Sequence, residues 1–329
     1  MSEQASAMGA KSGLYSAVRT IVVDALAAGA GAGLPTNTQY QSEHGFTAGT
    51  LQRALVFLQE RGAMSVVSRG HRGRFVDWIN LAESWQAAGL GPVRLLVPPA
   101  GLIEMDVLGE IFAATMTQNG IAHAIEHAHG GHNRLMSASA GIADIVAVSK
   151  STLELVSPTQ LPTSTSGALV RELPLNSFYA EGRVVVVRRA GESNQVPRTV
   201  AIDRNSPDHV LLTTAQFPPG SHAYVDIEFP RTLAWVLTGK ADAAVWHVNR
   251  TDVPVELAGF ELSPLDARSA ASEGADGSRA VLVAASHRPE LAAILDVLPL
   301  EGLVGIQREN IRAEQLRHAE FTVSARTMA

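Results

Sequence analysis

Residues 34–76 constrain the fold more than any other part of this 329-residue chain. Apolar residues recur there at the spacing of a helix with one buried face, at Leu51, Ala54, Leu55 and Leu58. Thr47 stands before this stripe as a capping residue, and Gly62 follows it as a helix stop. The spacing therefore predicts a helix over residues 48–61.

A shorter helix is expected just before it, over residues 37–44, opened by Pro35 and Thr36. Gly45 supplies the sharp turn between the two helices. Residues 64–68 and 74–76 read as two strands joined by a glycine-containing basic loop. Helix, tight turn, helix and hairpin together predict a winged helix-turn-helix, which lays its second helix into a DNA groove.

This stretch resembles the winged-helix domain of GntR-type bacterial transcription regulators. The resemblance is carried by Leu34, Pro35, Gly45, Thr47, Thr50, Leu51, Arg53, Ala54, Leu55, Leu58, Gly62, Phe75 and Val76. It implies a DNA-binding domain over residues 1–76. Thr38, Ala48 and Gln52 stand where that family usually carries arginines that touch DNA, so the family's usual operator does not carry over.

Double-stranded DNA is the partner expected for this domain, and its candidate contacts are polar or basic. They are Thr36, Thr38, Thr47, Thr50, Gln52, Arg53, Arg69, His71 and Arg72. A glutamine can pair with adenine, and an arginine with guanine or a phosphate. The alternative for each is a solvated surface side chain, and for the last three a merely charged hairpin tip.

Charge is unevenly placed along the chain. Residues 1–80 hold seven Lys or Arg against five Asp or Glu, a balance of +2, whereas the other residues hold nineteen against twenty-seven, a balance of −8. This asymmetry favours DNA contact through the N-terminal part. No apolar run approaches the length of a membrane span, and residues 1–13 lack a signal-peptide core, so we expect a cytoplasmic protein without membrane contact.

Residues 77–91 are expected to form a linker helix with Trp78, Leu81 and Trp85 on one face. Buried aromatic residues serve two uses here. The helix either docks on its neighbours or forms a dimer contact.

From Pro92 onward, short apolar strands alternate with helices, the pattern of an α/β fold with helices on both faces of a sheet. The expected strands are residues 93–97, 122–128, 144–148, 184–189, 198–202, 223–227, 243–247 and 280–284, and the expected helices are 102–119, 132–140, 207–214, 230–238 and 289–298. A Pro/Ser/Thr-rich loop is expected over 157–167, and a polar tail from Gln307 onward. Two echoed segments, Gly-Ile-Ala-Asp at 141–144 and Gly-Lys-Ala-Asp at 239–242, each precede a buried strand.

Two lobes crossed twice, by residues 184–189 and 280–284, resemble a type II periplasmic-binding-protein fold. The expected first lobe covers about 92–183 and 285–329, and the second about 190–279. A GntR-like winged helix joined to an effector domain over 92–329 is similar to the YhfZ-type regulators.

Open α/β sheets bind ligands beyond the carboxyl ends of their strands. That rule alone selects the candidate effector-binding residues Pro99, Gly101, Ser149, Lys150, Ser151, Asp203, Asn205, Ser206, His247 and Asn249. Hydroxyl groups and a cation near helix N-termini suit a small polar or anionic metabolite. The alternative for each residue is a cap or turn role.

Four histidines, at 123, 127, 129 and 132, are close enough in sequence to be candidate metal ligands. Along a strand, however, three ligands on one face are spread too widely for one coordination sphere, so polar packing is expected instead of a metal site. Cysteine is absent, and the common nucleophile and metalloprotease motifs are missing. We therefore expect no cofactor and no catalytic residues.

Two functions remain open from the sequence. The first is a homodimeric transcription regulator controlled by a small molecule bound between the lobes. The second is an enzyme on a binding-protein fold, whose winged helix has become a protein-interaction module.

Overall fold

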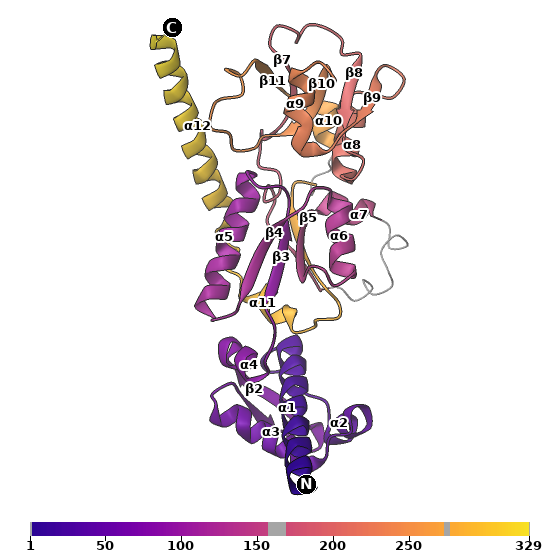
Figure 1. Cartoon of the computed structure of the whole chain (residues 1–329), viewed down its shortest axis with the longest axis vertical. Coiled ribbons are helices and arrows are strands. Elements are labelled where there is room, and N and C mark those ends of the chain that lie inside the picture. The colour runs from indigo at the N-terminus through magenta and orange to yellow at the C-terminus, as the bar shows by residue number, and fades with distance from the viewer. Residues whose placement is uncertain (1, 157–168, 273–276, 329) are drawn as a thin grey trace. The chain divides into compact units, whose positions relative to one another are not determined.

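The computed structural model describes residues 2–156, 169–272 and 277–328, so the expected loop at 157–167 lies outside the described residues (Figure 1). Most of the described elements match the expected order. The helices are α1 (Ser2–Ala28), α2 (Asn37–His44), α3 (Ala48–Glu60), α4 (Leu81–Ala87), α5 (Ile103–Gln118), α6 (Gly131–Ser139), α7 (Lys150–Leu155), α8 (Pro207–Gln216), α9 (Thr232–Leu237), α10 (Ala267–Ser272), α11 (Leu291–Val297) and α12 (Leu303–Met328), with short 3-10 turns η1 (Gly70–Arg72) and η3 (Phe229–Arg231). The strands are β1 (Met64–Ser68), β2 (Arg74–Ile79), β3 (Val93–Val97), β4 (His123–His127), β5 (Ile145–Ser149), β6 (Leu169–Glu172), β7 (Val184–Arg189), β8 (Thr199–Ile202), β9 (Ala223–Asp226), β10 (Ala243–His247), β11 (Phe260–Pro264) and β12 (Ala280–Ala284).

The described residues fall into two compact units. One contains those of Met1–Val93, Ala113–Ala124 and Ala284–Leu298, and the other contains those of Arg94–Phe112, Ile125–Val283 and Pro299–Ala329. No helix in the described ranges combines the length and the apolar character that crossing a membrane requires.

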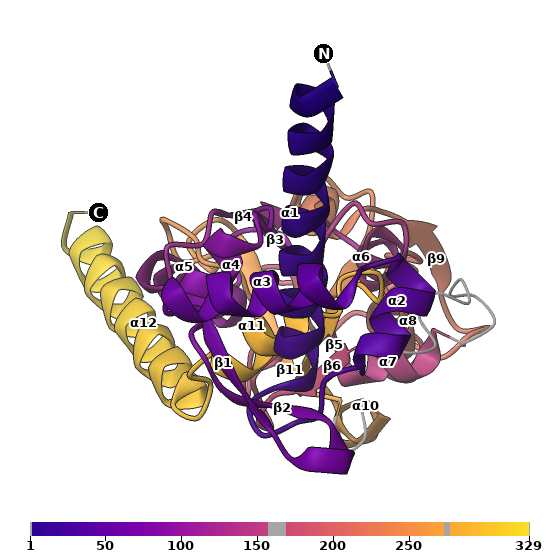
Figure 2. The same cartoon turned by 90° about the horizontal axis from the view of Figure 1, so that it is seen from below.

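In the first unit, helix α3 is set by its caps and its apolar stripe. The Thr47 hydroxyl accepts a hydrogen bond from the Thr50 backbone N–H at 3.2 Å, and Leu51, Ala54 and Leu58 are fully buried. α1 packs against α3 (Figure 2). Ile21 and Val22 of α1 are buried as well. Gly45, at φ 70°, ends α2 in the left-handed conformation that the expected turn requires.

The hairpin β1–β2 differs from the expectation in one respect. β2 continues to Ile79, and Trp78 pairs with Ser65 across the hairpin instead of lying on a helix. Its side chain is 41% exposed, whereas Trp85 on α4 is buried and its indole donates to Gly91 O at 3.1 Å. The Arg288 guanidinium lies over the Trp85 ring, 5.7 Å from its centre, so α4 docks on its neighbours as one of the two interpretations predicted.

The second unit holds most of two five-stranded sheets, which repeat one arrangement. The first sheet has the order β4-β3-β5-β12-β6, and the second has the order β9-β8-β10-β7-β11. In each sheet, the central strand of the first three, β3 or β8, comes first along the chain and is flanked by the two that follow it, β4 and β5 or β9 and β10. Next to β5 or β10 lies a strand that crosses between the lobes, β12 in the first sheet and β7 in the second, and β6 or β11 forms the other edge. We call the two sheets with their helices the first lobe and the second lobe.

The echoed Gly-x-Ala-Asp segments have the same structural role in both lobes. Asp144 accepts a hydrogen bond from the Arg94 backbone N–H at 2.7 Å, at the start of β3. Asp242 accepts from the backbone N–H groups of Arg198 and Thr199, both at 2.9 Å, at the start of β8. Each carboxylate therefore holds the first strand of its lobe beside the third.

Five described elements were not expected from the sequence as helices or strands, namely β6, β11, α7, α10 and α12. β6 and β11 were not expected, because short half-exposed edge strands carry little apolar signal. The expected polar tail is the 26-residue helix α12, whose buried face holds Leu303, Gln307, Ile311 and Glu314. Because two of these four side chains are polar, hydrophobic spacing alone did not reveal the helix.

Candidate functional site

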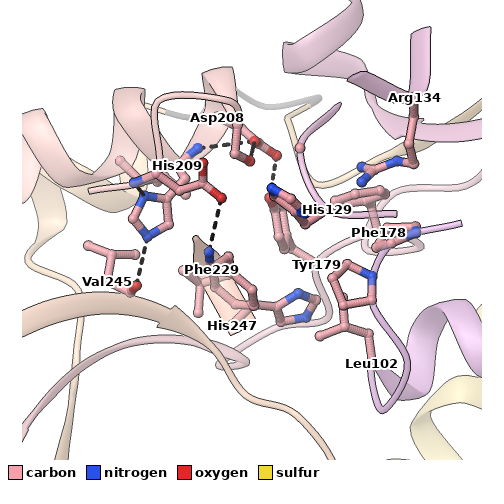
Figure 3. A pocket seen from close by; sticks show the side chains of 17 residues that line it. Leu102, His129, Arg134, Phe178, Tyr179, Asp208, His209, Phe229, Val245 and His247 are labelled. Atoms are coloured by element: carbon pink, nitrogen blue, oxygen red, sulfur yellow. Dashed lines mark hydrogen bonds between the residues drawn. The ribbon is translucent and has the colours of Figure 1, made fainter. Parts of the chain in front are cut away.

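A cavity in the second unit lies at the carboxyl ends of strands from both lobes, where an open α/β sheet places its ligands (Figure 3). Its volume is about 50 Å³. The first lobe contributes Pro98, Pro99, Leu102, His129, Gly130, Arg134, Phe178 and Tyr179, and the second contributes Val184, Asp203, Ser206, Asp208, His209, Leu212, Phe229, Val245 and His247.

Asp208, on the first turn of α8, joins the two lobes. Its carboxylate accepts hydrogen bonds from the hydroxyls of Tyr179 and Ser149, which belong to the first lobe. It also accepts from the Ser206 hydroxyl at 2.7 Å and from the His209 backbone N–H at 3.0 Å. Burial raises the pKa of Asp208, but these hydrogen bonds and the charge of Arg134 outweigh it and lower the pKa below its ordinary value. Asp208 is therefore an ionised carboxylate with all its acceptor sites in use.

Arg134, on α6, is 4% exposed and faces the cavity. Its Nε donates to Ala147 O at 2.9 Å and its Nη1 to Ala128 O at 2.8 Å. Burial lowers its pKa to about 10, so it carries its charge at neutral pH. Within the described ranges it forms no ion pair at 4 Å or less with a carboxylate, and this leaves a buried cation bonded to neutral carbonyls.

His209 is held as a neutral imidazole. Its Nδ1 accepts from the Asp203 backbone N–H at 3.1 Å, so the proton is on Nε2, which donates to Val245 O at 3.0 Å. Burial, opposed by that hydrogen bond and by the nearby aspartates, lowers the pKa of this histidine. Its ring therefore adds no positive charge to the cavity.

His247 ends β10 at the cavity wall and contacts a buried carboxylate. Its Nε2 lies 3.1 Å from Oε1 of Glu104, which is fully buried at the start of α5. Burial raises the pKa of Glu104, but the charge of His247 and its hydrogen bond outweigh this effect and lower the pKa to about 2. Gln307 on α12 donates to the Glu104 backbone carbonyl at 2.9 Å, so the cavity wall is connected to the C-terminal helix.

Of the candidate effector-binding residues, Pro99, Asp203, Ser206 and His247 line the cavity. The other six do not. Ser149 is buried and its hydroxyl donates to Asp208 at 3.0 Å, and the Ser151 hydroxyl donates to the Ser149 hydroxyl at 3.3 Å. Lys150 does not bring a cation to the cavity, because its Nζ pairs with Glu172 at 3.1 Å.

Gly101, Asn205 and Asn249 stand beside the cavity rather than in its wall. Gly101 O accepts from the Arg250 backbone N–H, and Asn249 neighbours Gly101. Asn205 is exposed and abuts Gly130. The strand-end rule thus selected four of the residues that line the cavity. It did not select Arg134 and Asp208, which lie on helices, or Tyr179, which lies in a loop.

Gly130 is a close contact between the lobes, and its replacement tests how tightly they meet. A Cβ there would lie 2.8 Å from Asn205 O, and its φ is 79°. Gly130→Ala is expected to lower the free energy of unfolding by more than the strain of about 1–3 kcal/mol that positive φ imposes alone, and therefore to lower the melting temperature. Gly182→Ala is the matched control, because Gly182 has φ 75° and nothing within 4 Å of its Cβ. Equal melting temperatures for the two variants would contradict the close contact.

The histidines at 123, 127 and 129 do not converge. The Nδ1 atoms of His123 and His127 lie 3.1 Å and 2.8 Å from the carbonyls of Ile121 and Pro98, while His129 lines the cavity. No group of three potential metal ligands is close enough for one ion in the part of the chain that the structure describes.

The candidate DNA-contacting residues lie on the first unit, and their polar ends are largely open to solvent. Thr38, Thr47, Gln52, Arg53, His71 and Arg72 are exposed, and Thr50 is half-buried. Thr36 and Thr47 also cap α2 and α3, so their hydroxyls are partly used within the fold. Arg69 is exposed and stacks over Phe75, with its guanidinium 4.5 Å from the ring centre.

The fold and the cavity define a two-lobed α/β protein with a pocket between its lobes that has both charged and apolar side chains in its wall. The YhfZ C-terminal domain model matches residues 81–317, so the chain belongs to the YhfZ family. It is 24% identical over 232 residues to the uncharacterized protein YhfZ of Escherichia coli K12, covering 70% of this chain and 73% of that protein.

Solved structures of the same general type are similar to this chain at low identity. The crystal structure of YhfZ from Shigella flexneri is 22% identical, with 68% of this chain and 92% of that chain covered and a TM-score of 0.47. The alkanesulfonate-binding protein SsuA from Xanthomonas axonopodis pv. citri, bound to MOPS, is 11% identical, with 70% and 79% covered and a TM-score of 0.48.

Proposed function

We propose that this protein is a DNA-binding transcription regulator whose operator affinity is controlled by a small polar molecule bound between the two lobes. The observation that supports ligand binding is the cavity at the carboxyl ends of strands from both sheets, with the buried Arg134 in its wall. The proposal assigns no catalytic residue and no cofactor. It places the protein in the cytoplasm as a homodimer.

The DNA-binding half is supported by the first unit. α2, Gly45, α3 and the hairpin β1–β2 follow one another in the order of a winged helix, and Gly49, Gln52 and Arg53 in the N-terminal half of α3 are exposed. Buried Leu51, Ala54 and Leu58 hold the opposite face of α3 in the core. The residues left free on that helix are therefore the ones that a major groove would meet.

A ligand can control DNA affinity because its site is formed by both lobes. A molecule that binds both lobes at once favours their closed arrangement, and it shifts DNA affinity only as far as it prefers one arrangement of the dimer. Two DNA-binding heads require half-sites about one helical turn apart.

A gel-shift titration with DNA fragments from around the protein's own gene tests the proposal. Wild type should bind one fragment saturably, with affinity falling as salt rises. Arg53→Ala should weaken binding by about 1–3 kcal/mol, or roughly 5- to 150-fold, if Arg53 contacts a base. Arg61→Ala removes the same charge from the other end of α3 and should bind nearly as wild type.

The outcomes separate the two functions left open by the sequence. Saturable binding that depends on Arg53 more than on Arg61 supports the regulator. Absence of saturable binding at low salt, or equal effects of the two substitutions, would count against the winged helix as a DNA reader.

A further inference from the structure

We infer that the ligand of the cavity is a small organic monoanion, and that its oxyanion binds Arg134 at the N-terminus of α6. This inference rests on the proposed role of the cavity as a ligand site and names the chemistry it selects. It follows from comparing the charged groups that line the cavity.

The two aspartates of the cavity are satisfied by the protein itself. Asp208 accepts four hydrogen bonds, as described above. Asp203 accepts from the backbone N–H groups of Asn205 at 2.9 Å and Phe229 at 3.1 Å. Neither carboxylate needs a cation from a ligand to compensate its burial.

Arg134 is compensated far less well. It is 96% buried, it is bonded to two neutral carbonyls, and within the described residues no carboxylate lies close enough for an ion pair. A buried charge is costly unless it is paired. A ligand oxyanion is the group that would complete its bonding, because a guanidinium presents five donors in a fork that matches two oxygens.

The helix that carries Arg134 has a free N-terminus at the same place. α6 begins after Gly130, which lines the cavity and has no side chain to cap the helix. By contrast, α8 across the cavity has Asp208 in its first turn, and the His209 backbone N–H donates a hydrogen bond to the Asp208 carboxylate. The first lobe therefore offers an N-terminus with a cation beside it, while the second lobe brings its own anion.

The rest of the wall limits the charge, the polarity and the size of the ligand. Asp203 and Asp208 lie near enough to influence the pKa of Arg134, so a dianion such as phosphate would meet two negative charges as well as one positive charge. Leu102, Phe178 and Phe229 provide apolar wall. The volume of about 50 Å³ fits about four water-sized groups, at 10–15 Å³ each. A monocarboxylate or monosulfonate with a short apolar body meets all three limits.

Thermal unfolding of the full-length protein tests this assignment at fixed ionic strength and at about pH 8, where inorganic phosphate is mainly the dianion. The probes are acetate, propionate and methanesulfonate, their neutral counterparts acetamide and propionamide, and inorganic phosphate. The melting temperature should rise with at least one monoanion, and the corresponding amide and phosphate should leave it unchanged. Isothermal titration then gives the dissociation constant of the most effective probe.

Substitutions identify Arg134 as the anchor. Arg134→Gln should weaken binding of that monoanion at least tenfold, and Arg134→Lys, which keeps the charge but not the fork, should weaken it less. Arg94→Gln is the matched control. Arg94 lies in the same unit, pairs with Asp144 at 3.4 Å and does not line the cavity. The Arg94→Gln protein should therefore bind the anion as tightly as wild type does. Should Arg134→Gln fail to fold, the Arg134→Lys comparison with wild type carries the same test.

The results separate this inference from the function on which it rests. Amides that bind as well as acids, or an Arg134 variant that binds the anion as tightly as wild type, would overturn the anion assignment and leave the cavity a ligand site. Anion binding that depends on Arg134 but does not change operator affinity would support the assignment and count against the regulator. No response to any probe would overturn the inference, while operator binding would still be measured independently.

Discussion

Replacing Glu104 with glutamine is expected to lower the free energy of unfolding by about 3 kcal/mol at pH 7. Glu104 is fully buried and compensates His247 and the nearby Arg183, and removing one member of a buried charged set leaves the others uncompensated. Its pKa of about 2, against an ordinary 4.5, gives the same magnitude at about 1.4 kcal/mol per pKa unit. Urea unfolding of both proteins measures the difference.

The difference in free energy of unfolding between wild type and Glu104→Gln should depend on pH in a known direction. A carboxylate whose folded pKa is lowered stabilises the fold above its ordinary pKa and loses that contribution as the pH falls. The difference between wild type and Glu104→Gln should therefore be full above about pH 4.5 and shrink toward pH 2. Glu110→Gln, on the exposed side of the same helix, should change stability by no more than a few tenths of a kcal/mol at any pH. A difference that does not change between pH 5 and pH 3 would contradict the assigned ion pair.

Asp208→Asn is the second substitution with a large expected effect. Four donors from both lobes meet the Asp208 carboxylate, and an amide would turn its own N–H groups toward some of them. Leaving buried donors unpaired costs about 1–3 kcal/mol for each group, so a loss of at least about 3 kcal/mol is expected. The melting temperature and urea midpoint measure it.

The matched control and a double substitution isolate the contact between the lobes. Asp226→Asn breaks the exposed pair with Arg204, at 2.6 Å, and should cost less than about 1 kcal/mol. Combined with Tyr179→Phe, Asp208→Asn should show a coupling energy of about 0.5–3 kcal/mol. Strict additivity would mean that the Tyr179 hydroxyl does not hold Asp208 across the cavity.

Local sequence signals predicted most of the elements because each depends on residues a few positions apart. Thr47 and Gly62 bound α3 through caps that reach only three or four residues. The two Gly-x-Ala-Asp segments predicted where the third strand of each lobe begins, because glycine ends the helix and the aspartate follows at a fixed distance.

The errors have a common cause as well. Trp78 fitted a helical face with Trp85, yet it lies in β2, because pairing with Ser65 on the neighbouring strand decided its conformation. α12 was read as a tail, because its buried side includes Gln307 and Glu314, whose partners lie more than a hundred residues away. Such polar side chains become core residues only when distant partners bond to them.

The sequence by itself determined most of the helices and strands, the caps, and the sheet edges beside which the candidate cavity lies. Only the tertiary structure decided what that site contains. Arg134 lies inside a helix with no motif around it, and Tyr179 and Ser149 reach Asp208 from 29 and 59 positions away along the chain. The physical reason is that capping and periodicity act over one or two turns, whereas the charge balance of a cavity depends on groups that meet only when both lobes have folded.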